Sequence, residues 1–215
     1  QHSAHMSSYI SKDKIIRARV PVRVSYAGGG TDMSYYINNT ASFILSSTIN
    51  KYCTASILVR KDKCINIFNK DLQIKYFAKD INGIKYGDEL DLIKACIKVM
   101  NPDFGFDLET FAEFDPGTGL GGSSSLVCSV LGAFNYFRNN KQLDLYQLAD
   151  LAYQVERIEM KIEGGWQDQY ATIFGGFNWI EFKRDKILVN PLRIKRDILL
   201  ELEYNLMLFR IGKSR

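Results

Sequence analysis

Alternating apolar and polar positions dominate the first half of the chain, which is the period of half-buried β-strands. The alternation predicts a strand from Ile15 to Ala27 that stops at three glycines. Four more strands are predicted at Ser42 to Lys61, Cys64 to Phe68, Leu72 to Phe77 and Phe106 to Phe114. Together these strands make a substantial sheet.

Apolar residues at helical spacing predict three helices. The first follows Asp88, a candidate N-cap, and is stopped by Pro102; its apolar positions are Leu90, Ile93, Ile97 and Met100. The second pattern begins at Leu126, and the third helix is expected from Leu145 to Lys161, with Leu148, Leu151 or Ala152, and Val155 on one face.

The last part of the chain mixes short elements. A short segment from Trp166 to Phe174 precedes a hairpin predicted at Gly176 to Phe182 and Lys186 to Asn190, and a final strand is predicted from Tyr204 to Ile211. This order of strands and helices favours an α+β domain over strict βαβ alternation. The stop soon after the final strand indicates a truncated chain.

Composition excludes several classes of protein. The 215 residues carry a formal charge of only +4 with scattered basic residues, which does not indicate binding to nucleic acid or membrane. No apolar run reaches the roughly 18 residues that span a bilayer, and no signal peptide is visible, so a cytoplasmic location is expected. The cysteines lack metal-site spacing and are expected to be free: Cys53, Cys64, Cys96 and Cys128.

Histidine is confined to His2 and His5, within residues 1–8, a segment that looks like the remainder of an affinity tag and is expected to lie outside the fold. Acid–base chemistry must then fall to Asp, Glu, Lys, Tyr or Cys. A metal must be held by oxygen ligands, which favours Mg²⁺ over Zn²⁺.

The strongest motif is a glycine- and serine-rich stretch directly before the Leu126 helix. Its glycines allow successive N–H groups to converge on a phosphate, and the helix N-terminus adds further donors. Its serines offer hydroxyls to phosphate or Mg²⁺. The residues expected to bind a polyphosphate are Pro116, Gly117, Thr118, Gly119, Leu120, Gly121, Gly122, Ser123, Ser124 and Ser125.

Other interpretations of this stretch fit less well. A P-loop needs a Gly-Lys-Ser/Thr ending, and no lysine lies between Lys98 and Lys141. A dinucleotide fold needs an acidic residue about 20 positions further on, where the chain instead has a polar turn. A glycine loop with a serine helix cap and no ligand stays open as an alternative.

A second candidate cluster contains Glu156 and Asp168. Asp168 lies between two glutamines in a segment bounded by glycine pairs, and Glu156 on the preceding helix could reach the same pocket. Together they offer a base and a metal ligand. Alternatively, Asp168 caps backbone N–H groups and Glu156 is solvated beside Arg157 or Lys161.

The third cluster joins the first predicted strand to its glycine turn. The strand delivers Arg23, and Asp32 follows the glycines, where it could accept hydrogen bonds from sugar hydroxyls. Alternatively, Thr31 and Asp32 cap the following segment and Arg23 lies on an exposed strand face.

Taken together, the three clusters resemble the GHMP kinases over about Arg17 to Ile211. Pro116 to Ser124 matches the family motif Pro-x-x-x-Gly-Leu-Gly-Ser-Ser-Ala except that Gly122 replaces its first serine, and Gly28 to Asp32 corresponds to Gly-Glu-His-Thr-Asp. The glycine-rich version of that motif and the later Trp166-Gln-Asp-Gln-Tyr look most like the branch that phosphorylates D-glycero-D-manno-heptose 7-phosphate.

The resemblance implies a role for each matching residue. Asp168 would be the catalytic base and Arg23 would stabilise developing charge, while Ser123 and Glu156 would hold Mg²⁺. The glycine loop would wrap the phosphates of ATP. The residues expected to contact the sugar are Gly29, Gly30, Thr31, Asp32 and Gln167.

It also implies a fold: a two-layer N-terminal domain of sheet and helices, similar to ribosomal-protein domains, over 9–190. Residues 191–215 would begin a truncated, ferredoxin-like C-terminal domain. The implied activity is transfer of the γ-phosphoryl of ATP to the anomeric hydroxyl of a sugar phosphate, and a homodimer is possible.

Two alternatives to this function stay open: a kinase of an unphosphorylated sugar, similar to fucokinase or galactokinase, and a binding protein without activity. A basic RNA-binding module is a third. The substrate phosphate would need a cation, for which the candidates are Arg17, Arg19, Lys161, Lys213 and Arg215.

Overall fold

One long strand, β2 (Ser42–Val59), is shared by most of the sheet in the computed structural model, which describes residues 14–207 and 209. β2 pairs antiparallel with β1 (Ile15–Ala27) along most of its length. On the opposite edge, its first residues pair with β6 (Phe177–Lys183) and its last residues pair with β5 (Phe106–Ala112), both antiparallel. A single strand therefore connects the two ends of the sheet.

The other strands extend the sheet at both ends. β3 (Ile65–Asn69) runs parallel to β5 and antiparallel to β4 (Ile74–Ala78), while β7 (Lys186–Pro191) forms a hairpin with β6. The order is β4-β3-β5-β2-β6-β7, with β1 paired to β2. The five strands predicted between Ile15 and Phe114 and the predicted hairpin are confirmed, with ends that differ by a few residues.

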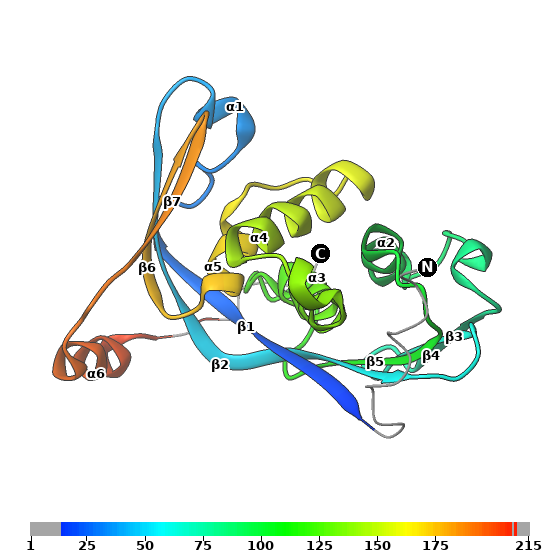
Figure 1. Cartoon of the computed structure of the whole chain (residues 1–215). Coiled ribbons are helices and arrows are strands. Elements are labelled where there is room, and N and C mark those ends of the chain that lie inside the picture. Colours follow the sequence, from blue (N-terminus) through cyan, green and yellow to red (C-terminus); the bar gives the residue numbers. More distant parts are fainter. Residues whose placement is uncertain (1–13, 208, 210–215) are drawn as a thin grey trace.

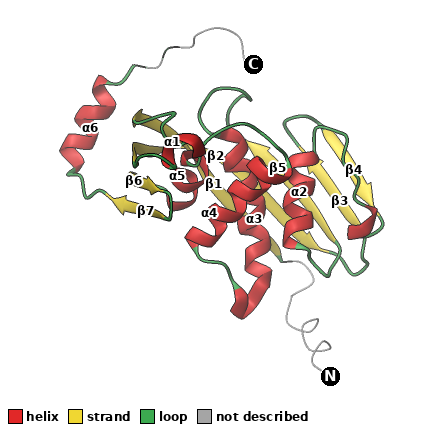
Figure 2. Cartoon of the chain, turned by 90° about the horizontal axis from the view of Figure 1, so that it is seen from above, coloured by secondary structure: helices red, strands yellow, loops and turns green. Residues whose placement is uncertain are grey.

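Four helices cover one face of the sheet (Figures 1 and 2). They are α2 (Asp91–Met100), α3 (Gly122–Asn135), α4 (Leu145–Tyr153) and α5 (Gln167–Phe174). The core lies between the two layers and includes fully buried Ile57, Ile97 and Val130. A smaller cluster around Tyr170 and Phe182 packs under the β6–β7 end. The predicted two-layer α+β fold is confirmed.

Local signals explain where these helices begin and end. The buried residues Ile93 and Ile97 give α2 its apolar face, and Asn101 ends it in the left-handed conformation at φ +46°. Asp144 and Gln147 form a reciprocal capping box that starts α4. The minor elements are α1 (Ser34–Ile37) and 3₁₀ turns at Ile81–Gly83 and Tyr136–Lys141.

The predicted helix from Leu145 to Lys161 is wrong in its second half. The α-helix stops at Tyr153, a π-helical turn follows over Gln154–Glu159, and Lys161 has φ +54°. This turn places the Glu156 carboxylate, which is completely buried, against polar partners on α3. Wide turns of this kind inside helices frequently lie at functional sites.

The predicted strand from Tyr204 to Ile211 is also wrong where the structure describes it. Residues Arg196–Asn205 form α6, a helix that contains Tyr204 and has no buried residue. Its sequence is rich in Leu and Glu, which are strong helix formers. These residues favour a helix over the strand that the following apolar residues suggested. Residues 208, 210 and 211 lie outside the described residues.

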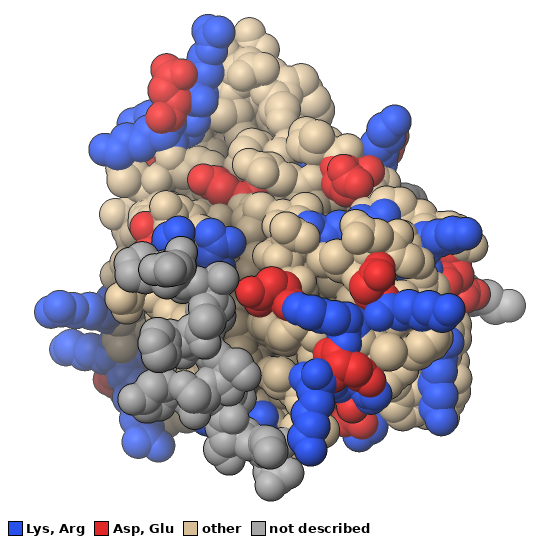
Figure 3. Space-filling model, turned by 45° about the vertical axis from the view of Figure 1, so that its right-hand side comes forward, with Lys and Arg blue, Asp and Glu red and all other residues tan. Residues whose placement is uncertain are grey.

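Charged side chains of both signs are mixed over the surface. On the face in Figure 3, Asp and Glu lie among the Lys and Arg side chains. Several form pairs, including Arg60 with Asp107 and Lys70 with Glu109. Among the described residues, no helix is long and apolar enough to cross a membrane.

Candidate functional site

The loop between β5 and α3 lines a cleft of about 490 Å³. Arg23 from β1 and Asp168 from α5 line the same cleft, so the structure brings all three elements together. Of the predicted phosphate-binding residues, seven line it: Pro116, Gly117, Thr118, Gly119, Gly121, Gly122 and Ser123. Residues far apart in the sequence thus share one cleft.

The glycines of this loop adopt conformations that other residues rarely take. Gly117, Gly119 and Gly121 have φ near +73°, and Gly121 is the N-cap of α3 without any side-chain cap. The alternative of a serine helix cap is therefore wrong. The first-turn N–H groups of α3 lie at the end of a positive-φ loop, an arrangement typical of anion sites.

The three serines behind the loop have different environments. Ser123 lines the cleft, whereas Ser124 and Ser125 are fully buried. Ser125 Oγ donates to the Val20 carbonyl over 2.8 Å and so ties α3 to β1. The prediction that Ser125 contacts a phosphate does not fit this placement. Leu120 also lies outside the cleft lining, and its carbonyl accepts a hydrogen bond from the Arg23 N–H.

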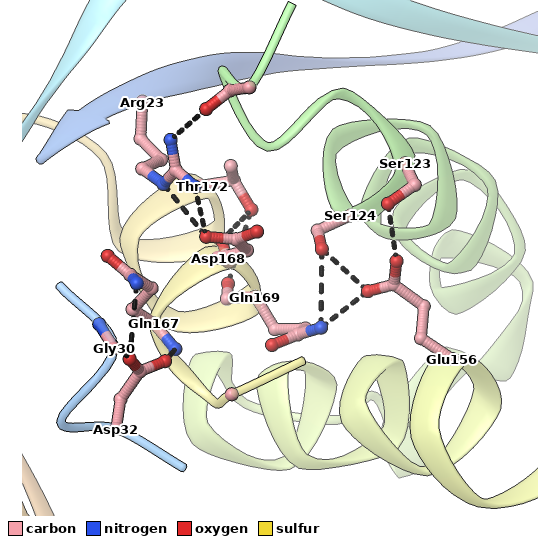
Figure 4. A network of polar contacts seen from close by, with 12 residues as sticks. Arg23, Gly30, Asp32, Ser123, Ser124, Glu156, Gln167, Asp168, Gln169 and Thr172 are labelled. Atoms are coloured by element: carbon pink, nitrogen blue, oxygen red, sulfur yellow. Dashed lines mark hydrogen bonds and ion pairs between the residues drawn. The ribbon is translucent and has the colours of Figure 1, made fainter. Parts of the chain in front are cut away.

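Arg23 and Asp168 form an ion pair at the cleft. Arg23 Nε and Nη2 lie 2.8 and 2.6 Å from Asp168 Oδ1, and Nη1 donates to the Gly119 carbonyl over 2.7 Å (Figure 4). The two side chains are only 12% and 20% exposed. Asp168 therefore does not cap backbone N–H groups, and Arg23 does not lie on an exposed strand face. Both contacts use Oδ1, which leaves the lone pairs of Oδ2 without a donor among the described residues.

Glu156 lies next to this cleft in a completely buried position (Figure 4). Its Oε1 accepts a hydrogen bond from Ser123 over 2.7 Å, and its Oε2 accepts hydrogen bonds from Ser124 and Gln169. Within the described residues, no Lys or Arg forms an ion pair with it. The alternative of a solvated Glu156 beside Arg157 or Lys161 is therefore wrong.

These oxygen donors fit a magnesium ion better than a transition metal. No cluster of three or more His, Cys, Asp or Glu side chains that could hold a metal occurs in the described part of the chain. Mg²⁺ typically uses one or two carboxylates and completes its octahedron with water and phosphate oxygens. Ser123 and Glu156 match that pattern.

Asp32 is placed differently from its prediction as a sugar ligand. It is 1% exposed, and its carboxylate accepts hydrogen bonds from the Gly30 N–H, the Gln167 N–H and the Gln167 side-chain amide. In this structure Asp32 therefore fixes the first residue of α5, and it does not line the cleft. It also does not cap α1, whose N-cap makes no side-chain hydrogen bond.

The glycine turn before Asp32 has mainly a structural task. A Cβ on Gly28 would lie 1.8 Å from the Phe43 carbonyl oxygen, so only glycine fits there. Thr31 Oγ1 is hydrogen-bonded to the Gly28 carbonyl and to Ser42 Oγ. Gly29, Gly30 and Thr31 do not line the cleft with Asp168.

Three of the five candidate phosphate-binding cations lie in the described part of the chain, and none of these three lines the cleft. Arg17 donates to Ser56, Arg19 pairs with Glu113, and Lys161 is exposed. Lys213 and Arg215 lie outside the described residues.

Sequence reasoning missed several cleft residues. Phe114 follows the end of β5 and its ring contacts Gly122, while Leu72 and Leu92 add apolar walls. Cys53 also lines the cleft, and burial raises the pKa of its thiol to about 11. In the sequence, Gln169 stands out only as a neighbour of Asp168, and nothing there indicates its contact with Glu156.

Residues 91–176 match the family model described as "GHMP kinases N terminal domain". This segment of the chain is similar to the N-terminal domain of the GHMP kinases. The matched range includes the glycine loop and Asp168, which line the cleft, and Glu156, which is buried beside it.

Relatives of the chain agree with the match. The chain is 39% identical over 210 residues to D-glycero-alpha-D-manno-heptose 7-phosphate kinase of Campylobacter jejuni, covering 94% of the chain and 61% of the relative. A D-glycero-D-manno-heptose 1-phosphate kinase from Bacteroides thetaiotaomicron superposes with TM-score 0.82 at 36% identity, covering 88% of this chain and 63% of that one. A putative sugar kinase from Campylobacter jejuni has TM-score 0.75 at 37% identity, covering 90% and 61%. The chain thus spans about three-fifths of the length of each of these three proteins.

Proposed function

We propose that this chain forms the nucleotide-binding part of an ATP- and Mg²⁺-dependent kinase that phosphorylates the anomeric hydroxyl of D-glycero-D-manno-heptose 7-phosphate. The supporting observation is the single cleft that contains both the glycine loop and the Arg23–Asp168 pair. The similarity to heptose phosphate kinases supports the sugar class. The 1,7-bisphosphate product would serve nucleotide-activated heptose and surface polysaccharide synthesis in the cytoplasm.

The glycine loop and the first turn of α3 would hold the phosphates of ATP. Phosphoryl transfer depends mainly on positioning and on stabilising charge on the transferred group. Backbone N–H groups of a positive-φ loop provide such stabilisation without a lysine. Arg23 fixes the loop from the other side through the Gly119 carbonyl.

Asp168 would receive the proton of the acceptor hydroxyl. Arg23 binds Asp168 Oδ1 and so holds the carboxylate in one orientation, while Oδ2 is available to accept a hydrogen bond from the sugar. The adjacent guanidinium also adds positive charge where the transferred phosphoryl group would pass. Arg23 therefore orients the base and contributes to the electrostatics of the site.

Ser123 and Glu156 are the residues that would hold Mg²⁺. When bound, the ion would neutralise charge on the phosphates and help align them. The buried Glu156 carboxylate supplies negative charge beside the loop, and its hydrogen bond to Ser123 keeps both donors together.

Asp168→Asn in the full-length protein tests the proposed base. We expect kcat to fall by about 100-fold or more, which is the range for loss of a general base, with ATP binding retained. Coupled detection of ADP gives kcat, and calorimetry gives the ATP affinity. Asp103→Asn, at an exposed position away from the cleft, is the matched control. Full activity in a folded Asp168→Asn variant would exclude Asp168 as the base.

A substrate panel tests the acceptor. Heptose 7-phosphate, heptose 1-phosphate, fucose and galactose are compared by kcat/KM with ADP release as the signal. Highest kcat/KM with heptose 7-phosphate is expected. Preference for fucose or galactose would instead establish a kinase of an unphosphorylated sugar, and ATP binding without turnover on any sugar would establish a binding protein.

A further inference from the structure

Gln169 lies at the point where three elements of the site meet. It follows Asp168 on α5, and because successive helical residues point about 100° apart, the two side chains face different surroundings. Asp168 faces Arg23 at the cleft, whereas Gln169 is completely buried and extends towards α3 and the π-helical turn (Figure 4). Its amide nitrogen donates a hydrogen bond to Glu156 Oε2 and lies 3.2 Å from Ser124 Oγ.

The chemistry of this amide suits the carboxylate that it touches. Ser123, Ser124 and Gln169 all donate to Glu156, and none of them carries a charge. Neutral donors stabilise and orient a carboxylate but do not cancel its charge, as a lysine or arginine would. An amide also cannot titrate. The carboxylate is thereby kept in one orientation and available to a cation.

The orientation of the Gln169 amide is determined by the network. If the amide were flipped, its oxygen would face the carboxylate oxygen, and two acceptors would repel each other. Nε2 therefore faces Glu156, and Oε1 is left buried without a hydrogen-bond partner among the described residues. Buried unpaired acceptors are uncommon in folded proteins and usually have a specific reason. Here the amide is held in this orientation by its contact with Glu156.

The geometry points to Gln169 as a positioning residue that sets the orientation of the metal-binding carboxylate Glu156. It also connects that carboxylate to α5, the helix that carries Asp168. This inference rests on the proposed function, because it assigns Glu156 to Mg²⁺. Residues that orient metal ligands in this way typically change metal affinity by 10- to 100-fold when they are replaced.

Gln169→Met tests the inference, because methionine nearly keeps the volume and loses the donor. The apparent affinity of the full-length protein for Mn²⁺, a probe for Mg²⁺, is measured by electron paramagnetic resonance with ATP present. We expect about 10-fold weaker Mn²⁺ binding and a similar rise in the KM for Mg²⁺, with KM for the sugar unchanged. Gln169→Glu is expected to restore neither, because it would place a second carboxyl group against Glu156.

Asn135→Leu is the matched control for loss of a buried amide. Asn135 Nδ2 donates to the Leu143 carbonyl, remote from Glu156, so this variant is expected to lower stability without changing Mn²⁺ affinity. Unchanged Mn²⁺ affinity in folded Gln169→Met would overturn the role of Gln169. Absence of Mn²⁺ binding at the site in the unmodified protein would instead overturn the proposed function, so the two failures are distinguishable.

Discussion

At the scale of single residues, Gly122 and Phe114 explain the departure of the loop from the family motif. A Cβ on Gly122 would lie 2.6 Å from Phe114 Cε2, a distance that real Cβ atoms do not tolerate. The ring of Phe114 thus occupies the space that a serine side chain needs. Glycine at position 122 therefore removes one hydroxyl of the family motif and makes room for an aromatic ring in the wall of the cleft.

Gly122→Ser alone is therefore expected to lower the free energy of unfolding by about 1–3 kcal/mol, the usual cost of overpacking. The double variant Gly122→Ser with Phe114→Leu should recover part of that loss, because the stability changes of substitutions at residues in contact are not additive. Urea unfolding of the two single variants and the double variant measures both effects. If the stability losses of the two single variants were additive in the double variant, or if Gly122→Ser were as stable as the unmodified protein, the contact between position 122 and Phe114 would be contradicted.

Cys53 gives the cleft a pH-dependent probe. Burial raises the pKa of its thiol to about 11, so the reactive thiolate is scarce at neutral pH and increases as pH rises. Iodoacetamide should modify Cys53 about tenfold faster for each unit between pH 7.5 and 9.5, and ATP should slow the reaction.

Peptide mass spectrometry separates Cys53 from the other three cysteines in this measurement. The half-buried Cys64 lies away from the cleft lining and is the internal control, because ATP should leave its rate unchanged. A rate for Cys53 that levels off near pH 8.5 would show that its pKa is not raised.

At the scale of elements, α5 depends on its neighbours. It has eight residues, which is too short to be stable alone in water. The Asp32 carboxylate accepts a hydrogen bond from the N–H of the first residue of α5, and Gln169 and Tyr170 lie on the buried side of the helix. The orientation of Asp168 is therefore determined by contacts from outside the helix.

Asp32→Asn should disturb α5 without removing a substrate contact. One acceptor for the Gln167 donors is lost in a buried position, which we expect to cost about 1–3 kcal/mol of stability and to lower kcat, with KM for the sugar little changed. Urea unfolding and steady-state kinetics give the three values. Asp144→Ala, which removes the side-chain cap of α4, is the control and should reduce stability without lowering kcat. A large rise in KM for the sugar at unchanged stability would support Asp32 as a direct ligand.

The sequence was sufficient for elements whose signals are local. The alternation in β1 and β2 and the helical spacing in α2 depend on side chains close in sequence, and they agree with the structure to within a few residues. The π-helical turn at Glu156 could not be predicted, because it arises from contacts with serines on α3. Helix α6 was missed because an apolar run behind it resembled a strand.

In the candidate site, too, local motifs could be predicted from the sequence and tertiary contacts could not. The motifs located the glycine loop and Asp168, but exposure and partners are tertiary properties. Asp32 was therefore expected to face a sugar and is instead buried against α5, and Ser125 is bonded to β1. Phe114 and Gln169 had no motif of their own and became visible only through the residues that they touch.

At the scale of the whole molecule, the long strand β2 joins the β5 end of the sheet to the β6–β7 hairpin. β5, with β3 and β4 beyond it, extends from the last part of β2, while the hairpin extends from its first part. The helices that carry the cleft residues pack on the same side of this sheet (Figure 2).

β2 is one strand from Ser42 to Val59, but its middle residues 49–51 pair with neither β5 nor β6, and the register with β1 shifts beside them. The two halves of the sheet therefore meet where the hydrogen-bonded ladder is weakest. Bending of one half against the other would concentrate at these three residues, while the regular ladders on either side would move as units. Rates of ligand enclosure would then depend on this short segment of β2 as well as on the glycine loop.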